Sequence, residues 1–65
     1  MDEIELRYFI AVAENESVSR AAEKLNISQP AVSMMIRKLE NELDAKLFDR
    51  SANRVHLNKA GETAL

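Results

Sequence analysis

The chain has 65 residues, no cysteine, one histidine and a formal net charge of −2. A chain this short allows one small domain with a modest core, and its composition excludes disulfide bonds and metal sites built from clustered Cys and His. It contains no apolar run long enough to cross a membrane and no secretion signal, so we expect a soluble cytoplasmic protein that needs no cofactor.

The charge is distributed in blocks. Residues 1–16 carry one base and five acids, and residues 40–49 carry one base and four acids. Between and after them, residues 17–39 carry four bases and one acid, and residues 50–65 carry three bases and one acid. Such blocks are usually only solvated faces, but the two positive ones coincide with the segments that the motifs below assign to phosphate contact.

The first predicted element is an amphipathic helix over Glu3–Asn15. Leu6, Phe9, Ile10 and Ala13 follow one another at i, i+3, i+4 and i+7, which places them on one face of a helix. We interpret this helix as a scaffold for the rest of the domain.

A second, shorter helix is predicted over about Ser19–Leu25. Either Ser17 or Ser19 can cap its start through the side-chain hydroxyl. Asn26 ends it, because asparagine tolerates the left-handed conformation that often follows a helix. The residues expected to face inward are Ala21, Ala22 and Leu25.

The third helix is predicted from about Gln29 to Leu43. Ser28 is a suitable N-cap, and Pro30 is tolerated in the first turn, where its missing N–H would have no partner within the helix. The expected buried stripe is Val32, Ile36, Leu39 and Leu43. The opposite side then carries Pro30, Ser33, Met34 and Arg37, with Gln29 at the exposed tip.

Two strand-like runs follow, Lys46–Arg50 and Arg54–Leu57. The turn formers between them include Asn53, which suits a positive φ, so we expect a hairpin with arginines near its tip. Asn58 can cap a last helix, and Gly61 in its first turn indicates close packing.

These elements predict a mainly α winged helix-turn-helix. Its small and apolar positions are filled by Ala22, Leu25, Ile27 and Val32, which lets two helices cross closely so that the second can enter a DNA major groove. We expect this domain over residues 1–57. Residues 58–65 are expected to be the start of a helix too short to be stable alone, so the end of the chain looks like a cut.

Three segments carry a resemblance to a known family: SRAAEKLNISQPAVS, IRKLENEL and LFDRSANRVHLNKAG. Their order and separations resemble the N-terminal DNA-binding domain of LysR-type transcriptional regulators over nearly the whole chain. The resemblance implies a bacterial regulator that binds double-stranded operator DNA as a homodimer or tetramer. It also implies a linker helix that pairs subunits, and a small-molecule effector bound by a further domain absent from this chain.

The resemblance also implies contacts for individual residues. Gln29, Pro30 and Ser33 would reach base edges or sugar in the major groove, and Arg50 and Arg54 would lie at the backbone or minor groove. The segment around Ser17, Ser19 and Arg20 would contact phosphate. The position of Met34 is often basic or polar in this family and touches DNA. Family wings often carry arginine at the positions of Asn53 and His56, so this wing is expected to bind phosphate less strongly.

The side-chain chemistry agrees with these roles. Gln29 can form a bidentate contact to adenine, and Met34 can contact a thymine methyl group. Arg20, Arg37 and Lys38 suit phosphate, which positions a protein without reading the sequence. The candidate DNA-binding residues are therefore Ser17, Ser19, Arg20, Ser28, Gln29, Pro30, Ser33, Met34, Arg37, Lys38, Arg50 and Arg54.

Other interpretations remain open at this point. Arg37 and Lys38 could pair with Glu40 or Glu42 on the same helix, and Met34 could be an ordinary exposed methionine. The whole domain could be a protein-interaction module whose surface is the acidic first helix together with Met34. An enzyme is not expected, because the sequence has no cysteine, no histidine paired with a nucleophile and no glycine-rich loop.

Overall fold

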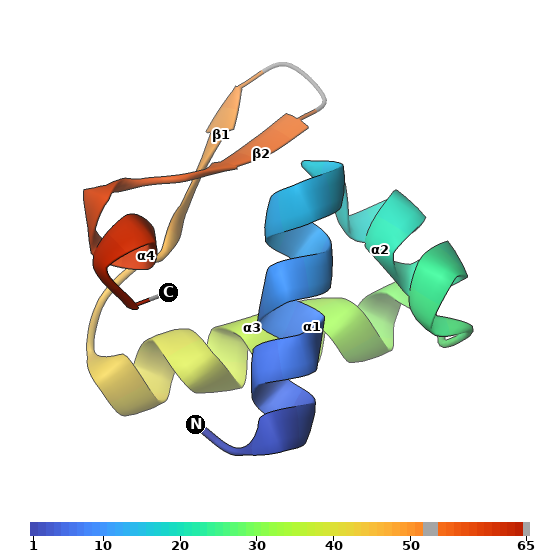
Figure 1. Cartoon of the computed structure of the whole chain (residues 1–65), viewed down its shortest axis with the longest axis horizontal. Coiled ribbons are helices and arrows are strands. Elements are labelled where there is room, and N and C mark those ends of the chain that lie inside the picture. Colours follow the sequence, from blue (N-terminus) through green and yellow to red (C-terminus); the bar gives the residue numbers. More distant parts are fainter. Residues whose placement is uncertain (52–53, 65) are drawn as a thin grey trace.

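The computed structural model describes residues 1–51 and 54–64, and in this part of the chain three helices precede a hairpin and a short last helix (Figure 1). The elements are α1 (Glu3–Asn15), α2 (Val18–Leu25), α3 (Gln29–Leu43), β1 (Phe48–Ser51), β2 (Arg54–Leu57) and α4 (Lys59–Ala64). Helix α1 crosses α3 and packs against α2, and the hairpin lies beside the C-terminal end of α1. This is the predicted winged helix-turn-helix. No helix among the described residues is long and apolar enough to span a membrane.

Side-chain caps fix where the helices begin. At the start of α1, the Asp2 carboxylate accepts from the Glu5 amide (2.8 Å) and Glu5 Oε1 accepts from the Asp2 amide (3.0 Å), which is a complete capping box. Ser17 caps α2 by accepting from the amide of Arg20 (3.1 Å), so this helix begins at Val18, one residue earlier than predicted. Ser28 caps α3, as predicted.

The three long helices each end at a residue in the left-handed conformation. The φ angles are 51° at Glu16, 59° at Asn26 and 52° at Asp44. The prediction for Asn26 is confirmed. Glycine is the usual residue at such helix ends and asparagine the next most common, so Glu16 is an unusual choice that the local sequence did not reveal.

The core forms where the three helices and the hairpin meet. Its fully buried side chains are Phe9, Val12, Ala21, Val32, Leu39 and Leu47, each at most 1% exposed. The rings of Phe9 and Phe48 meet edge to face, with centroids 5.4 Å apart, and so join α1 to β1.

Several predicted core positions are wrong: of the stripe predicted for α1 only Phe9 is buried, since Ile10 and Ala13 are half-buried. Helix α1 buries Glu5, Phe9 and Val12, whereas Leu6 is 37% exposed. The apolar stripe is rotated because Val12 lies in the core cluster with Ile36 of α3 and Val55 of β2, while Leu6 lines a surface hollow between α1 and α2. Leu43 is 44% exposed, because the last turn of α3 extends beyond the core.

The hairpin is antiparallel, with Phe48 opposite Leu57 and Ser51 opposite Arg54. Strand β1 begins at Phe48 rather than at Lys46, since the amide of Leu47 donates to Glu40 Oε2 of α3 (2.8 Å). This bond ties the base of the wing to α3. The predicted positive φ of Asn53 lies outside the described residues.

The last helix is capped and packed as predicted. Asn58 Oδ1 accepts from the amide of Gly61 (2.9 Å). A Cβ on Gly61 would lie 2.2 Å from the carbonyl oxygen of Leu47 and 2.8 Å from Leu57 Cδ2, so only glycine lets α4 approach the wing this closely. The division of the chain between residues 57 and 58 remains a prediction.

Candidate nucleic-acid interface

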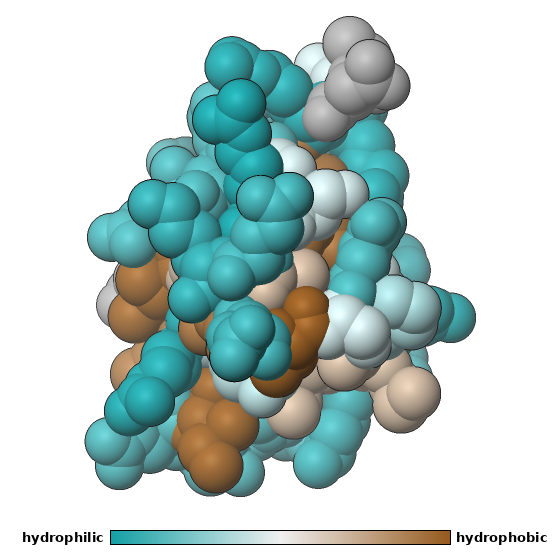
Figure 2. Space-filling view, turned by 90° about the vertical axis from the view of Figure 1, so that its right-hand side faces the viewer, coloured by the Kyte–Doolittle hydropathy of each residue, from teal (hydrophilic) through white to brown (hydrophobic). Residues whose placement is uncertain are grey.

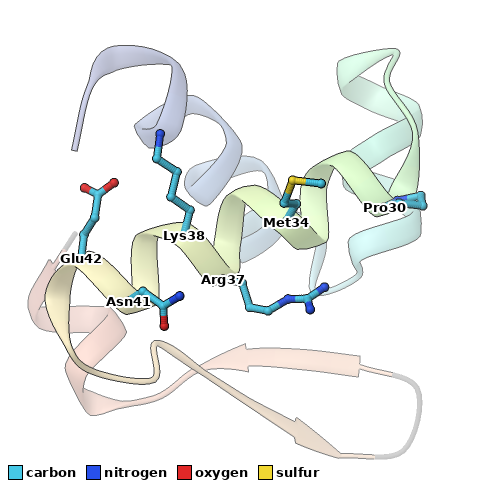
Figure 3. A pocket seen from close by; sticks show the side chains of 6 residues that line it. All are labelled: Pro30, Met34, Arg37, Lys38, Asn41 and Glu42. Atoms are coloured by element: carbon cyan, nitrogen blue, oxygen red, sulfur yellow. The ribbon is translucent and has the colours of Figure 1, made fainter.

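Helix α3 has one buried and one open side. Val32, Ile36 and Leu39 face the core, and the opposite side is not covered by α1, which crosses behind α3 in Figure 3. On this open side Met34 is 67% exposed, and Pro30 and Arg37 are exposed with it. The predicted outward ridge of α3 is therefore available to a ligand.

A polar hollow gathers residues that lie far apart in the sequence. It has a volume of about 390 Å³ and lies where the starts of α2 and α3 meet the hairpin. The predicted DNA-binding residues that line it are Ser17, Ser19, Gln29, Arg50 and Arg54. The fold thus brings three separate predicted segments to one place.

Two further hollows continue this surface along α3. One, of about 430 Å³, lies between α3 and the hairpin and is lined by Ser33, Arg37 and Arg50 among others. The next, of about 700 Å³, runs along the open side of α3 past Pro30, Met34 and Arg37 (Figure 3). Arg50 lines the first two hollows and Arg37 the last two, so the three are neighbours on one side of the molecule. We call this surface the α3–wing face; its predicted members are Ser17, Ser19, Gln29, Pro30, Ser33, Met34, Arg37, Arg50 and Arg54.

Gln29 is held in place within this face. The hydroxyl of Ser19 donates to Gln29 Oε1 at 2.9 Å, across the turn between α2 and α3. An amide oxygen has two lone pairs and the amide nitrogen two protons, so Gln29 can keep this bond and still accept and donate on its other side. Those are the two bonds that a bidentate contact to adenine requires.

The basic side chains differ in what they contact. Among the described residues, Arg37 and Arg50 form no ion pair, which leaves both guanidinium groups available. Lys38 does not pair with Glu40 or Glu42; its Nζ lies 3.8 Å from Oε2 of the buried Glu5. In Figure 3, Lys38 accordingly points toward α1, whereas Arg37 lies on the side of the hairpin.

Three predicted residues lie outside the α3–wing face or at its margin. Arg20 lines a different hollow with Asn15, Glu23 and Lys24. The hydroxyl of Ser28 is used to cap α3. Lys38 borders the hollow along α3, but its ammonium group is directed to α1. Contacts of these three residues with DNA, like those of the α3–wing face, remain predictions.

One residue next to the face was missed. Glu16 lies at the end of α1, and its carboxylate contacts Arg54 (3.4 Å) and His56 (3.1 Å) of β2. No spacing or motif in the sequence indicated this contact, because residue 16 and the hairpin are joined only by the fold.

One face of the molecule offers little support for the interaction-module interpretation. On the face shown in Figure 2, hydrophilic side chains predominate and hydrophobic ones form small, separate patches. Protein-binding surfaces are usually marked by a larger contiguous apolar patch. This side of the molecule resembles an ordinary polar surface.

Comparison with known proteins identifies the family. The family described as bacterial regulatory helix-turn-helix protein, lysR family, matches residues 4–62, which is nearly the whole chain. The chain belongs to the LysR family. It is the helix-turn-helix DNA-binding domain of such a regulator and not an enzyme, as the sequence predicted.

Individual relatives and structures agree with this assignment. The chain is 53% identical over 57 residues to the RuBisCO operon transcriptional regulator of Allochromatium vinosum, covering 88% of this chain and 19% of that regulator. It is 48% identical over 61 residues to the regulator ClcR of Pseudomonas putida, covering 94% and 21% respectively. The LysR domain therefore spans about a fifth of the length of these relatives.

Solved structures show the same fold bound to DNA. The crystal structure of the CbnR_DBD–DNA complex superposes with a TM-score of 0.93 at 38% identity, covering 100% of this chain and 75% of that one. The BenM_DBD/benA site 1 DNA complex superposes with a TM-score of 0.92 at 41% identity, covering 98% and 72%.

Proposed function

We propose that the α3–wing face binds operator DNA, with α3 in the major groove and the hairpin against the adjacent backbone or minor groove. The observation that carries this proposal is that the three hollows are neighbours through Arg37 and Arg50, which places the open side of α3 beside Arg50 of the wing. A recognition helix that protrudes beside a wing is the docking geometry of helix-turn-helix domains.

Within this face, position decides which groups read bases. Gln29 and Ser33 lie on the N-terminal half of α3 and are assigned to base edges or sugar, as recognition helices use their first residues for this purpose. Pro30 and Met34 offer apolar contact to thymine methyl groups. Arg37, Arg50 and Arg54 are assigned to phosphates, which fix the register of the protein on the duplex.

The complete regulator is expected to be longer than this domain. Its relatives are about five times as long as the segment they share with it, which leaves room for a linker helix and an effector-binding domain. We infer that the whole protein is a homodimer or tetramer, responds to a small molecule through that other domain, and acts in the cytoplasm on the chromosome.

Salt dependence tests the proposed function directly. Binding of the chain to duplex DNA, measured by fluorescence anisotropy across a salt series, should weaken linearly on a log–log plot, because each neutralised phosphate releases counterions. Arg50→Ala should reduce the slope by about 0.9, the value for one lost phosphate contact on B-DNA. Arg7→Ala removes the same charge from α1, away from the α3–wing face, and should leave the slope unchanged. Duplex binding that is absent at low salt would instead favour the protein-interaction module.

The proposed contact of Met34 with a thymine methyl group provides a second test. On a duplex selected from a random pool, Met34→Ala should lower the affinity roughly fourfold, the effect of exposing about one buried methyl group. Replacing the contacted thymine with deoxyuridine should have a similar effect in the wild type and almost none in the variant. Leu43→Ala, at the far end of α3, is the matched control. If deoxyuridine lowers affinity equally in wild type and Met34→Ala, Met34 does not contact that methyl group.

A further inference from the structure

Glu16, directly after α1, contacts the wing through both its backbone and its side chain. Glu16 stops the helix in the left-handed conformation (φ 51°) while its amide donates to the carbonyl of Val12 (2.9 Å). Its own carbonyl accepts from the amide of Val55 in β2 (3.1 Å). Its carboxylate lies between two wing side chains, with Oε1 3.4 Å from an Arg54 guanidinium nitrogen and Oε2 3.1 Å from His56 Nδ1.

The backbone conformation at the C-terminal end of α1 does not require a glutamate at position 16. Glycine is the usual residue at a left-handed helix end because it has no Cβ to strain, and the backbone bond to Val55 needs no side chain at all. What glutamate adds is a negative charge beside Arg54, a residue that lines the α3–wing face. The carboxylate is 42% exposed, so it also faces solvent beside that surface.

We propose that Glu16 is a positioning residue that holds Arg54 and reduces the number of phosphates the wing neutralises, which restrains non-specific DNA binding. This inference rests on the proposed function. Arg54 and Glu16 together carry no net charge, so a phosphate that reaches Arg54 also meets the carboxylate. At 0.1 M salt, charges interact over a Debye length of about 10 Å, and a carboxylate 3.4 Å from Arg54 lies well within that distance.

The consequence for specificity follows from what Arg54 does. Phosphate contacts raise affinity for every duplex, whereas base contacts from α3 raise it for the correct one only. A wing with one fewer effective cation binds non-specific DNA less tightly and leaves more of the discrimination to Gln29 and Ser33. Glu16 thus sets how much of the DNA affinity comes from the wing and how much from the recognition helix.

The test is a salt series on a short random-sequence duplex at one fixed pH, using the whole chain. Glu16→Gln should increase affinity by about five- to tenfold at 0.1 M salt and steepen the log–log slope by about 0.9, because the Glu16 carboxylate then no longer offsets the contact of Arg54 with its phosphate. Glu16→Gly removes the same carboxylate in a residue that suits the backbone angle, and should do the same. Arg54→Gln should change the log–log slope in both backgrounds. The change in the wild-type background should be less than half of the change in the Glu16→Gln background.

Glu14→Gln is the control, since it removes an equal charge two residues away at an exposed position that forms no ion pair within the described residues. Its slope should remain that of the wild type. If Glu16 only braces the hairpin, both Glu16 variants will bind less tightly with an unchanged slope, and the proposal is overturned. A wild-type chain that binds no duplex at low salt would overturn the proposed function and this inference with it. Binding with equal slopes in all variants would overturn the inference alone.

Discussion

Phe9→Ala is expected to lower the free energy of unfolding by about 3–5 kcal/mol. Phe9 is fully buried and forms the edge-to-face contact with Phe48 that joins α1 to the wing. This cost combines the lost burial of the ring with the cavity left behind. The stability of a domain of 65 residues is about 3–10 kcal/mol in total, so this one substitution removes a large part of it.

Thermal and urea unfolding followed by circular dichroism measure this effect. Leu6→Ala is the informative control, because the sequence pattern placed Leu6 on the same stripe and the structure leaves it partly exposed. Leu6→Ala should lower the free energy of unfolding by about 1 kcal/mol or less. Equal losses for the two variants would mean that the face α1 buries is the one the sequence pattern predicted, and that the packing described above is wrong.

Gln29→Ala is expected to abolish discrimination at one base pair of the operator. Gln29 lies at the exposed tip of α3, and Ser19 already orients its amide. A bidentate contact from such an amide to adenine contributes about 1–3 kcal/mol of discrimination, or roughly 5- to 150-fold in affinity. The wild-type chain should therefore prefer A·T at the contacted position, and the variant should bind all four base pairs there nearly equally.

The measurement is a titration of the selected duplex and its single base-pair variants with both proteins. Ser19→Ala distinguishes the contact of Gln29 with the base from the orientation of its amide by Ser19. This variant keeps Gln29 but removes the hydrogen bond from Ser19 to Gln29 Oε1 (2.9 Å). Discrimination should therefore fall by a smaller factor than in Gln29→Ala. Met35→Ala, at a half-buried position of α3 outside the α3–wing face, should retain the preference. A uniform loss of affinity for every duplex in Gln29→Ala would show that this residue positions the protein without reading a base.

The sequence by itself determined the features that local physics controls. The cap at Ser28, the left-handed stop at Asn26 and the glycine needed under the wing each depend on interactions within a few residues or on one close approach. For α2 the sequence offered Ser17 and Ser19 as caps, and the structure has Ser17. Helices α1 and α3 accordingly have the bounds that their patterns predicted. The order of these elements was enough to indicate the winged helix-turn-helix.

Only the tertiary structure decided which faces and charges are free. Burial of Val12 in place of Leu6 depends on where the hairpin lies, and a helical pattern contains no information on that. The partners of Lys38 and Arg54 are the carboxylates of Glu5 in α1 and of Glu16 directly after α1, 33 and 38 residues distant in the sequence, and no local pattern relates them. Local rules set where each element starts and stops because their interactions span a turn or two. The electrostatics of the DNA-binding surface depend on how the elements pack, and packing joins residues that the sequence keeps apart.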